Sequence, residues 1–221
     1  EKESYYIYRQ EMNGRVQTGL VACFAVDDYL EENIKKHEHT RADKEDDRTR
    51  HIDVCSAQTG LVFLTFKEGD RAREALGNAV VDEPLYDFTS EDRVHQRMWK
   101  IDDEAQVAAI TEAFSEIKTL YIADGHHRSA SAATVCQQRR EELGTYTGDE
   151  EFNYFMAVAF PCEDLLVMPY YRVVSDLNGM ETEEFLAKLE ERFIVEKKDL
   201  NLYEPKHQGE VAMFLDDVWY K

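Results

Sequence analysis

Residues 120–144 contain the pattern that most constrains the fold of this chain. The run Leu-Tyr-Ile-Ala-Asp at 120–124 is short and mostly apolar, as in a buried strand, and Gly125 interrupts it. The stretch from Ser129 to Leu143 is rich in alanine and ends at Gly144, which is typical of a helix and its C-terminal cap. The sequence therefore predicts a strand, a tight turn and a helix in direct succession.

The turn itself is the first candidate site, because it contains Asp124, His126, His127 and Arg128 within five residues. The first N–H groups of a helix lack intrahelical partners and carry partial positive charge, so this corner suits an anion, especially phosphate. Gly125 lets a ligand approach the main chain closely, and the planar guanidinium of Arg128 can donate to phosphate or carboxylate. The structural alternative is a capped helix whose histidines satisfy backbone groups and bind no ligand.

A second concentration of polar residues lies between Ile34 and Arg50. A helix is expected over residues 42–58, and on it Lys44 and Arg48 are one turn apart and share a face. The run His-Glu-His-Thr at 37–40 precedes this helix, and a carboxylate beside histidines suits a general base or a metal ligand. The spacing is not that of the zinc-protease motif. A solvated helix face with salt bridges is the alternative interpretation.

The remaining patterns predict an α/β protein of the α+β kind, in which mixed sheets with hairpins are flanked by helices. Asn-Gly at 13–14 indicates a hairpin between strands at 5–9 and 16–26. A second hairpin is expected to join residues 152–160 to 165–168 through the turn at 161–164. Arg172 would then lie at the end of the next sheet segment, either completing an anion pocket or at its rim. Further helices are expected at 27–30, 71–77, 103–114 and 180–192, and further strands at 61–66, 84–89, 93–101, 193–196, 210–215 and 218–220.

Composition restricts the partners and the setting. The chain has 221 residues and 43% hydrophobic residues, enough for the core of one large domain or two small ones. Its net charge of −20 repels a polyanion, so nucleic acid is not expected as a partner. The four cysteines have no CxxC spacing, which favours a reducing cytoplasm over a disulfide framework. No apolar run approaches the roughly 18 residues of a membrane span, and the first residues do not resemble a signal peptide. The oligomeric state cannot be read from these features.

Several of these motifs occur together in one known family. They are Thr-Gly-Leu-Val-Ala followed by Asp-Asp-Tyr, then Ile-Lys-Lys-His-Glu-His-Thr, Lys44 with Asp47-Arg48, Ala-Asp-Gly-His-His-Arg and Pro-Tyr-Tyr-Arg. The succession resembles domain-of-unknown-function family 1015 (DUF1015) over nearly the whole chain. Members of that family are longer at both ends, so the chain resembles a central part. The strand-like ends of the chain also favour a fragment.

The Asp-Gly-His-His-Arg segment also resembles the phosphate-binding signature of the ParB and sulfiredoxin-like superfamily, which includes free serine kinases that use ADP or ATP. This resemblance implies a ParB/sulfiredoxin-like nucleotide-binding region over residues 1–144. A second, sheet-rich region over 145–221 would pack on it and continue beyond the chain. Ser129 departs from the family pattern, because the family commonly has tyrosine at this position. This difference bears on the identity of the substrate more than on phosphate binding.

The resemblance and the residues together lead to the expectation of a nucleotide-dependent phosphotransferase, a small-molecule kinase acting on a hydroxylated metabolite such as free serine. Phosphoryl transfer chiefly needs positioning and positive charge around the transferred group. Glu38 is the candidate general base, and Glu38 and Asp124 are the candidate Mg²⁺ ligands. Asp124, His126 and His127 complete the catalytic candidates. The residues expected to hold ATP or ADP are Gly125, His126, His127, Arg128, Lys44, Arg48 and Arg172.

Other functions fit the same residues. In a metal-dependent hydrolase, His37, His39, His126 and His127 would supply nitrogen ligands while Glu38 activates water. A non-catalytic ParB-like protein would use the pocket to bind a nucleotide as a switch. A binding module without turnover is the remaining alternative.

Overall fold

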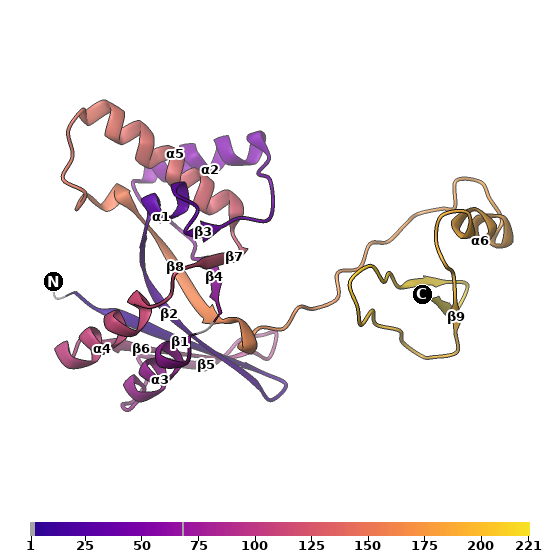
Figure 1. Cartoon of the computed structure of the whole chain (residues 1–221), viewed down its shortest axis with the longest axis horizontal. Helices are drawn as coiled ribbons and strands as arrows, with labels where there is room; N and C mark the ends of the chain where they lie inside the picture. Colours follow the sequence, from indigo (N-terminus) through magenta and orange to yellow (C-terminus); the bar gives the residue numbers. More distant parts are fainter. Residues whose placement is uncertain (1–2, 68) are drawn as a thin grey trace. The chain divides into compact units, whose positions relative to one another are not determined.

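The computed structural model describes residues 3–67 and 69–221, and the chain forms two compact units, Glu1–Leu165 and Leu166–Lys221 (Figure 1). The first unit contains an eight-stranded sheet. The division falls after Leu165, later than the boundary expected at residue 144. The reason is that strand β8 (Tyr154–Pro161) pairs on both sides with strands of the first unit.

The large sheet is mixed, which confirms the α/β class. Its strands lie in the order β3-β7-β4-β8-β2-β1-β6-β5. The neighbours β3–β7 and β4–β8 run parallel, while the other neighbouring pairs are antiparallel. The remaining strands are β1 (Tyr5–Met12), β2 (Arg15–Ala25), β3 (Ile34–Lys35), β4 (Val62–Phe66), β5 (Tyr86–Thr89), β6 (His95–Ile101) and β7 (Leu120–Asp124).

The first hairpin forms as the sequence predicts. Met12 of β1 faces Arg15 of β2, and the two residues between them have positive φ angles, 53° at Asn13 and 78° at Gly14. Two consecutive left-handed residues make a type I′ turn, whose twist matches that of the strands it joins. Asparagine and glycine are the residues that tolerate these angles best.

Helices cover one face of this sheet. Val62, Leu64 and Phe66 are buried with Phe155, Ala157 and Ala159 beneath residues of α1 and α5, while Ile7, Leu20 and Trp99 pack against α3 and α4. The alternation along β4 places these side chains on one face, because successive strand residues point to opposite sides. The helices are α1 (Val26–Leu30), α2 (Ala42–Cys55), α3 (Asp70–Ala79), α4 (Glu104–Ser115) and α5 (His126–Leu143).

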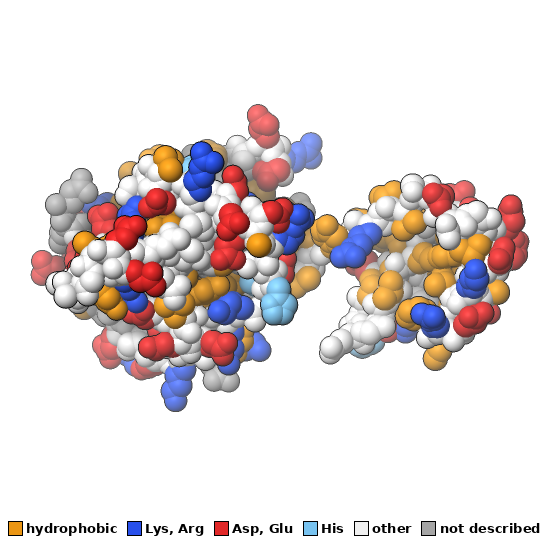
Figure 2. Space-filling model, turned by 90° about the horizontal axis from the view of Figure 1, so that it is seen from above, with side chains coloured by type: hydrophobic (Ala, Val, Ile, Leu, Met, Phe, Trp, Pro, Cys, Tyr) orange, Lys and Arg blue, Asp and Glu red, His pale blue; other side chains and the backbone are white. Residues whose placement is uncertain are grey.

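The second unit is small. It contains α6 (Thr182–Glu190) and a three-stranded sheet of β9 (Lys197–Lys198), β10 (Met213–Leu215) and β11 (Val218–Tyr220), in the order β10-β11-β9. Hydrophobic side chains gather on its surface (Figure 2). Phe185, Leu189 and Val211 of this unit line a cavity of about 490 Å³.

The prediction of a hairpin between residues 152–160 and 165–168 is wrong. β2 and β4 occupy both edges of β8, so no ladder position remains for a following strand. The chain instead turns through a 3₁₀ helix, η2 (Cys162–Asp164), and residues 165–174 form neither helix nor strand. The described residues 193–196 do not form the expected strand; the short strand β9 begins directly after them, at Lys197.

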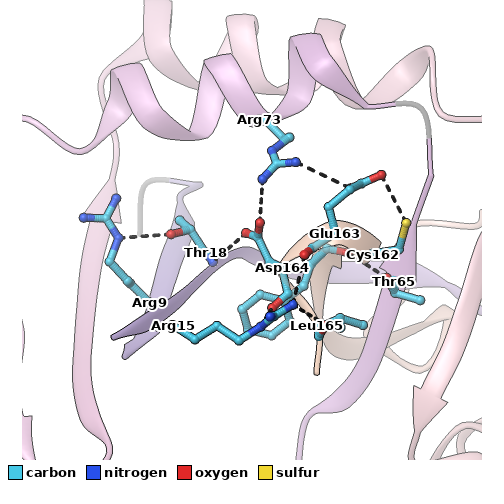
Figure 3. Close-up of polar contacts among 10 residues, drawn as sticks. Arg9, Arg15, Thr18, Thr65, Arg73, Cys162, Glu163, Asp164 and Leu165 are labelled. Atoms are coloured by element: carbon cyan, nitrogen blue, oxygen red, sulfur yellow. Dashed lines mark hydrogen bonds and ion pairs between the residues drawn. The ribbon is translucent and has the colours of Figure 1, made fainter. Parts of the chain in front are cut away.

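Polar contacts fix the direction in which the chain leaves β8 (Figure 3). The guanidinium of Arg15 donates to the backbone carbonyls of Glu163, Asp164 and Leu165, at 3.1, 2.9 and 2.6 Å. The carboxylate of Asp164 accepts from the backbone N–H of Thr18 and from the guanidinium of Arg73. These contacts hold η2 against β2 and α3. They also satisfy backbone carbonyl groups that a returning strand would otherwise pair.

Candidate functional site

The predicted strand, turn and helix are present at residues 120–144. β7 ends at Asp124, Gly125 adopts a φ of 101°, and α5 then runs to Leu143, with Gly144 at a φ of 69°. A Cβ atom added to Gly125 would lie 3.1 Å from two guanidinium nitrogens of Arg128. The positive φ favours glycine at this turn, and Arg128 leaves little space for a side chain there.

Arg128 braces the turn. Its guanidinium donates to the carboxylate of Asp124 and to the backbone carbonyl of Leu61, just before β4. The Asp124 side chain is 73% exposed, whereas that of Arg128 is half-buried. Two of the guanidinium nitrogens are thus committed within the protein, and a ligand would meet an arginine whose orientation is already set.

The 36–41 loop (residues 36–41, between β3 and α2) meets this turn through two histidines. The Nε2 atom of His126 accepts from the backbone N–H of His37 at 3.5 Å, and Nε2 of His127 accepts from that of Arg41 at 3.1 Å. The rings of His37 and His126 stand edge to face, with their centroids 4.4 Å apart. The two polar segments of the sequence are therefore brought together.

The environment of His126 favours its neutral form. The residue is only 5% exposed, and burial together with the neighbouring His37 lowers the pKa of its imidazole from the ordinary value of 6.5. Because Nε2 accepts a hydrogen bond, the neutral ring carries its proton on Nδ1, which lies 3.7 Å from Oε2 of Glu38. His126 thus supports the loop and faces the Glu38 carboxylate, whose side chain is 61% exposed.

The helices α2 and α5 pack side by side with their N-termini at the same end. Near their starts, the Ser131 hydroxyl donates to the backbone carbonyl of Glu45, and further along the Arg139 guanidinium donates to Asp53. The first turn of α2 contains acidic residues, whereas that of α5 contains none and has no side-chain cap within the described structure. The partial positive charge at the start of α5 is therefore not offset by a carboxylate of its own first turn.

The other basic residues of the predicted site, Lys44, Arg48 and Arg172, are divided between the two units of the chain. Lys44 and Arg48 lie exposed on α2, and their side chains form no hydrogen bond or ion pair with any residue that the structure describes. Arg172 belongs to the second unit, where its guanidinium lies 5.8 Å from the ring centroid of Tyr170. It is exposed in a segment without strand structure, so the sheet that was expected to position it is absent.

The candidate metal ligands do not form a closed site. Among residues 3–67 and 69–221, no group of three or more histidine, cysteine, aspartate or glutamate side chains is placed to hold a metal ion. A structural or catalytic zinc site needs three or four such ligands. Mg²⁺ in nucleotide sites uses one or two carboxylates together with phosphate oxygens, which Glu38 and Asp124 could provide.

The contacts of Glu45 were not predicted from the sequence. Its carboxylate accepts from the hydroxyls of Thr40 at 2.6 Å and Thr134 at 3.2 Å, and it thereby joins the 36–41 loop to α5. Thr40 and Glu45 do not have capping-box spacing, which requires glutamate three residues after the cap. The signal in the sequence was the i, i+4, i+7 spacing that puts Glu45, Thr49 and Ile52 on one helix face, and this face is half-buried in the structure.

Comparisons with known proteins agree with the motifs quoted above. No curated protein and no solved structure matches the chain. In the part of the chain that the structure describes, every helix is too short or too polar to cross a membrane. The family model "Protein of unknown function (DUF1015)" matches residues 1–221, and the chain therefore belongs to the DUF1015 family.

Proposed function

We propose that the first unit binds the phosphates of ATP or ADP at the N-terminus of α5 and transfers a phosphoryl group to a small hydroxylated metabolite. Free serine is the first acceptor to test. The observation that carries the proposal is the meeting of the 36–41 loop with the start of α5, through the hydrogen bonds that His126 and His127 accept. This contact places a carboxylate, Glu38, beside a helix start that no acidic residue of its own first turn neutralises.

The start of α5 supplies the anion-binding chemistry. The N–H groups of its first turn have no intrahelical acceptors, and the helix dipole favours a negative group at this end. Gly125 has no side chain to block the approach of a phosphate. Lys44 and Arg48, on the neighbouring helix, have no ion-pair partner among the described residues, and they would neutralise charge on the phosphates. The similarity of this turn to the phosphate-binding signature of ParB and sulfiredoxin-like proteins supports the same conclusion.

Glu38 would act as the general base. Its exposed carboxylate would take the proton of the acceptor hydroxyl while that oxygen forms its bond to the transferred phosphorus and the bond to the leaving phosphate oxygen breaks. The Nδ1–H group of His126 faces this carboxylate and would orient it. His126 and His127 are therefore assigned positioning roles. Mg²⁺ bound with the nucleotide would offset phosphate charge, and Asp124, whose side chain is 73% exposed, is the carboxylate available to hold it while Glu38 serves as the base.

Binding is tested by isothermal titration calorimetry of the 221-residue chain with ATP and ADP in the presence of Mg²⁺. Arg48→Ala is compared with Arg50→Ala, which removes the same charge from the same helix, two residues further on and also exposed. Loss of one charge-assisted contact is expected to weaken binding by about tenfold in Arg48→Ala and to leave Arg50→Ala unchanged. Absence of binding by both nucleotides, or equal effects of the two substitutions, would contradict the proposal.

Turnover is tested by mass spectrometry of serine incubated with the protein, nucleotide and Mg²⁺. Glu38→Gln should lower kcat by about a hundredfold or more, the range of general-base effects, while nucleotide affinity stays within about twofold of the wild type. Glu31→Gln removes an exposed carboxylate from the preceding turn and should retain activity. A Glu38→Gln variant with full activity would remove Glu38 from the mechanism. Zinc that copurifies with the protein and supports hydrolysis without nucleotide would favour the metal-dependent hydrolase instead.

A further inference from the structure

The 36–41 loop has little burial of its own to hold it in place. Apart from the partly buried Thr40, its residues are exposed, and none belongs to a helix or strand. Its position therefore depends on polar contacts at a few points. His126 and His127 provide two of these by accepting backbone N–H groups, and the Thr40 hydroxyl provides another. At the two ends of the loop, Lys36 lies over the ring of Tyr29 and Arg41 forms an ion pair with Asp43 of α2.

The Thr40 contact ends on the carboxylate of Glu45, which joins the 36–41 loop and α2 to α5. One oxygen of Glu45 accepts from the loop residue Thr40 at 2.6 Å, and the other accepts from Thr134 of α5 at 3.2 Å. The backbone carbonyl of Glu45 accepts from Ser131 at 3.1 Å. Glu45 is half-buried and forms no ion pair within the described residues, so its interactions are those with hydroxyl donors.

We infer that Glu45 is a positioning residue for the candidate site, an inference that rests on the proposed function for its link to catalysis. Glu45 holds Thr40, and through Thr40 it fixes the backbone between Glu38 and Arg41 against the start of α5. A carboxylate accepts stronger hydrogen bonds than a neutral group, so two hydroxyl donors suffice to order this short segment. Glu45 acts through the loop, because both of its carboxylate oxygens already have protein partners.

The inference is tested first without any ligand, by amide hydrogen exchange measured with NMR on the whole chain. In Glu45→Ala, the amides of His37 and Arg41, which are bonded to the two imidazoles, should exchange at least about tenfold faster, a loss of about 1.4 kcal/mol of local protection. Asp46→Ala removes an adjacent exposed carboxylate from the same helix and should leave these rates unchanged. Unchanged rates in Glu45→Ala would overturn the inference.

Two further variants separate a loop effect from damage to α2. Thr40→Val keeps the shape of the side chain but removes the loop donor, so it should reproduce the faster exchange while contacts between α2 and α5 remain. Glu45→Gln keeps one acceptor oxygen and gains an amide that can donate to a hydroxyl oxygen, so it should restore slow exchange. Faster exchange in Glu45→Ala with wild-type rates in Thr40→Val would mean that Glu45 acts only by stabilising α2, and the positioning role would be lost.

A kinetic measurement connects the loop to the proposed reaction. Because Glu45 does not face the phosphate site, Glu45→Ala should lower kcat by about tenfold while the Kd of the nucleotide changes by less than about twofold. An equal loss of nucleotide affinity would contradict positioning of Glu38 alone. If the wild-type protein binds no nucleotide, the proposed function fails, whereas the exchange data still decide whether Glu45 holds the loop.

Discussion

Replacing Gly125 by alanine gives a sharp test of the turn at the start of α5, because Gly144 at the other end of the helix provides a matched control. Both glycines adopt left-handed backbone angles, with φ of 101° and 69°. A Cβ atom at Gly144 would meet no atom within 4 Å, so Gly144→Ala should cost about 1–2 kcal/mol of backbone strain and little else.

Gly125→Ala carries a second cost. Its Cβ would lie 3.1 Å from Nε and Nη2 of Arg128, so the guanidinium would have to move by a few tenths of an ångström, which weakens its hydrogen bonds to Asp124 and Leu61. Complete loss of a hydrogen bond to a charged group costs about 1.5–3 kcal/mol, and weakening one should cost a fraction of this, about 1 kcal/mol. The variant should therefore be about 2–3 kcal/mol less stable than the wild type, and about 1 kcal/mol less stable than Gly144→Ala.

The assay is urea denaturation followed by tryptophan fluorescence. Trp219 belongs to the second unit, so all variants are made in a Trp219→Phe background, in which Trp99 reports on the first unit alone. The free energy of unfolding is then compared at equal m value. If Gly125→Ala is no less stable than Gly144→Ala, Arg128 does not occupy the space beneath the turn, and the account of the site's rigidity is wrong.

Three further predictions concern stability. The pKa of His126 is lowered by burial and by the neighbouring His37, so the folded state favours the neutral imidazole. The contribution of the neutral ring to stability is complete above the ordinary pKa of about 6.5 and is lost as pH falls through the folded-state pKa. The wild type should therefore lose more stability than His126→Asn between pH 7.5 and 5 in urea titrations, and parallel losses would contradict this. Gly19→Ala would place a Cβ 2.7 Å from a ring carbon of Phe160 and 2.8 Å from the carbonyl oxygen of Ala159, so both the ring and the backbone would have to shift, and calorimetry should show a loss of about 3 kcal/mol. A loss below about 1 kcal/mol would contradict this. Arg140→Ala removes two hydrogen bonds to Asp27 and one to Asn153, so urea denaturation should show a loss of about 1–3 kcal/mol in the free energy of unfolding. A smaller loss would mean that these hydrogen bonds do not stabilise the fold.

The local structure around the site was predictable because glycines mark its boundaries. Gly125 and Gly144 delimit α5, and both adopt the positive φ angles that other residues avoid. The Asn13-Gly14 turn was equally clear, because a type I′ turn needs two such residues in succession. These features depend on the residues themselves and their immediate neighbours.

Residues 165–174 show why other predictions failed. Their run of apolar and aromatic residues has high strand propensity, but propensity describes a fit to a sheet surface and does not provide a partner strand. β2 and β4 already flank β8, and the contacts of Arg15 and Asp164 turn the chain away. Pairing between distant strands is not visible in the local pattern.

The two segments of the candidate site could be predicted from the sequence, but their contact with each other could not. Asp124 to Arg128 are adjacent in sequence, whereas the 36–41 loop reaches them because β3 pairs in parallel with β7 through only two residues, Ile34 and Lys35. Nothing in the periodicity of so short a strand indicates its partner. The link made by Glu45 depends in turn on the packing of α2 against α5.

The most direct test of the central claim is a titration of the isotopically labelled chain with Mg²⁺ and ATP or ADP, followed by amide NMR shifts. A phosphate at the start of α5 should produce saturable shifts in Gly125, His126, His127 and Arg128 and in the 36–41 loop, because their N–H groups would donate to its oxygens or lie beside them. Saturable shifts confined to other parts of the chain, or no shifts at millimolar nucleotide, would contradict the account.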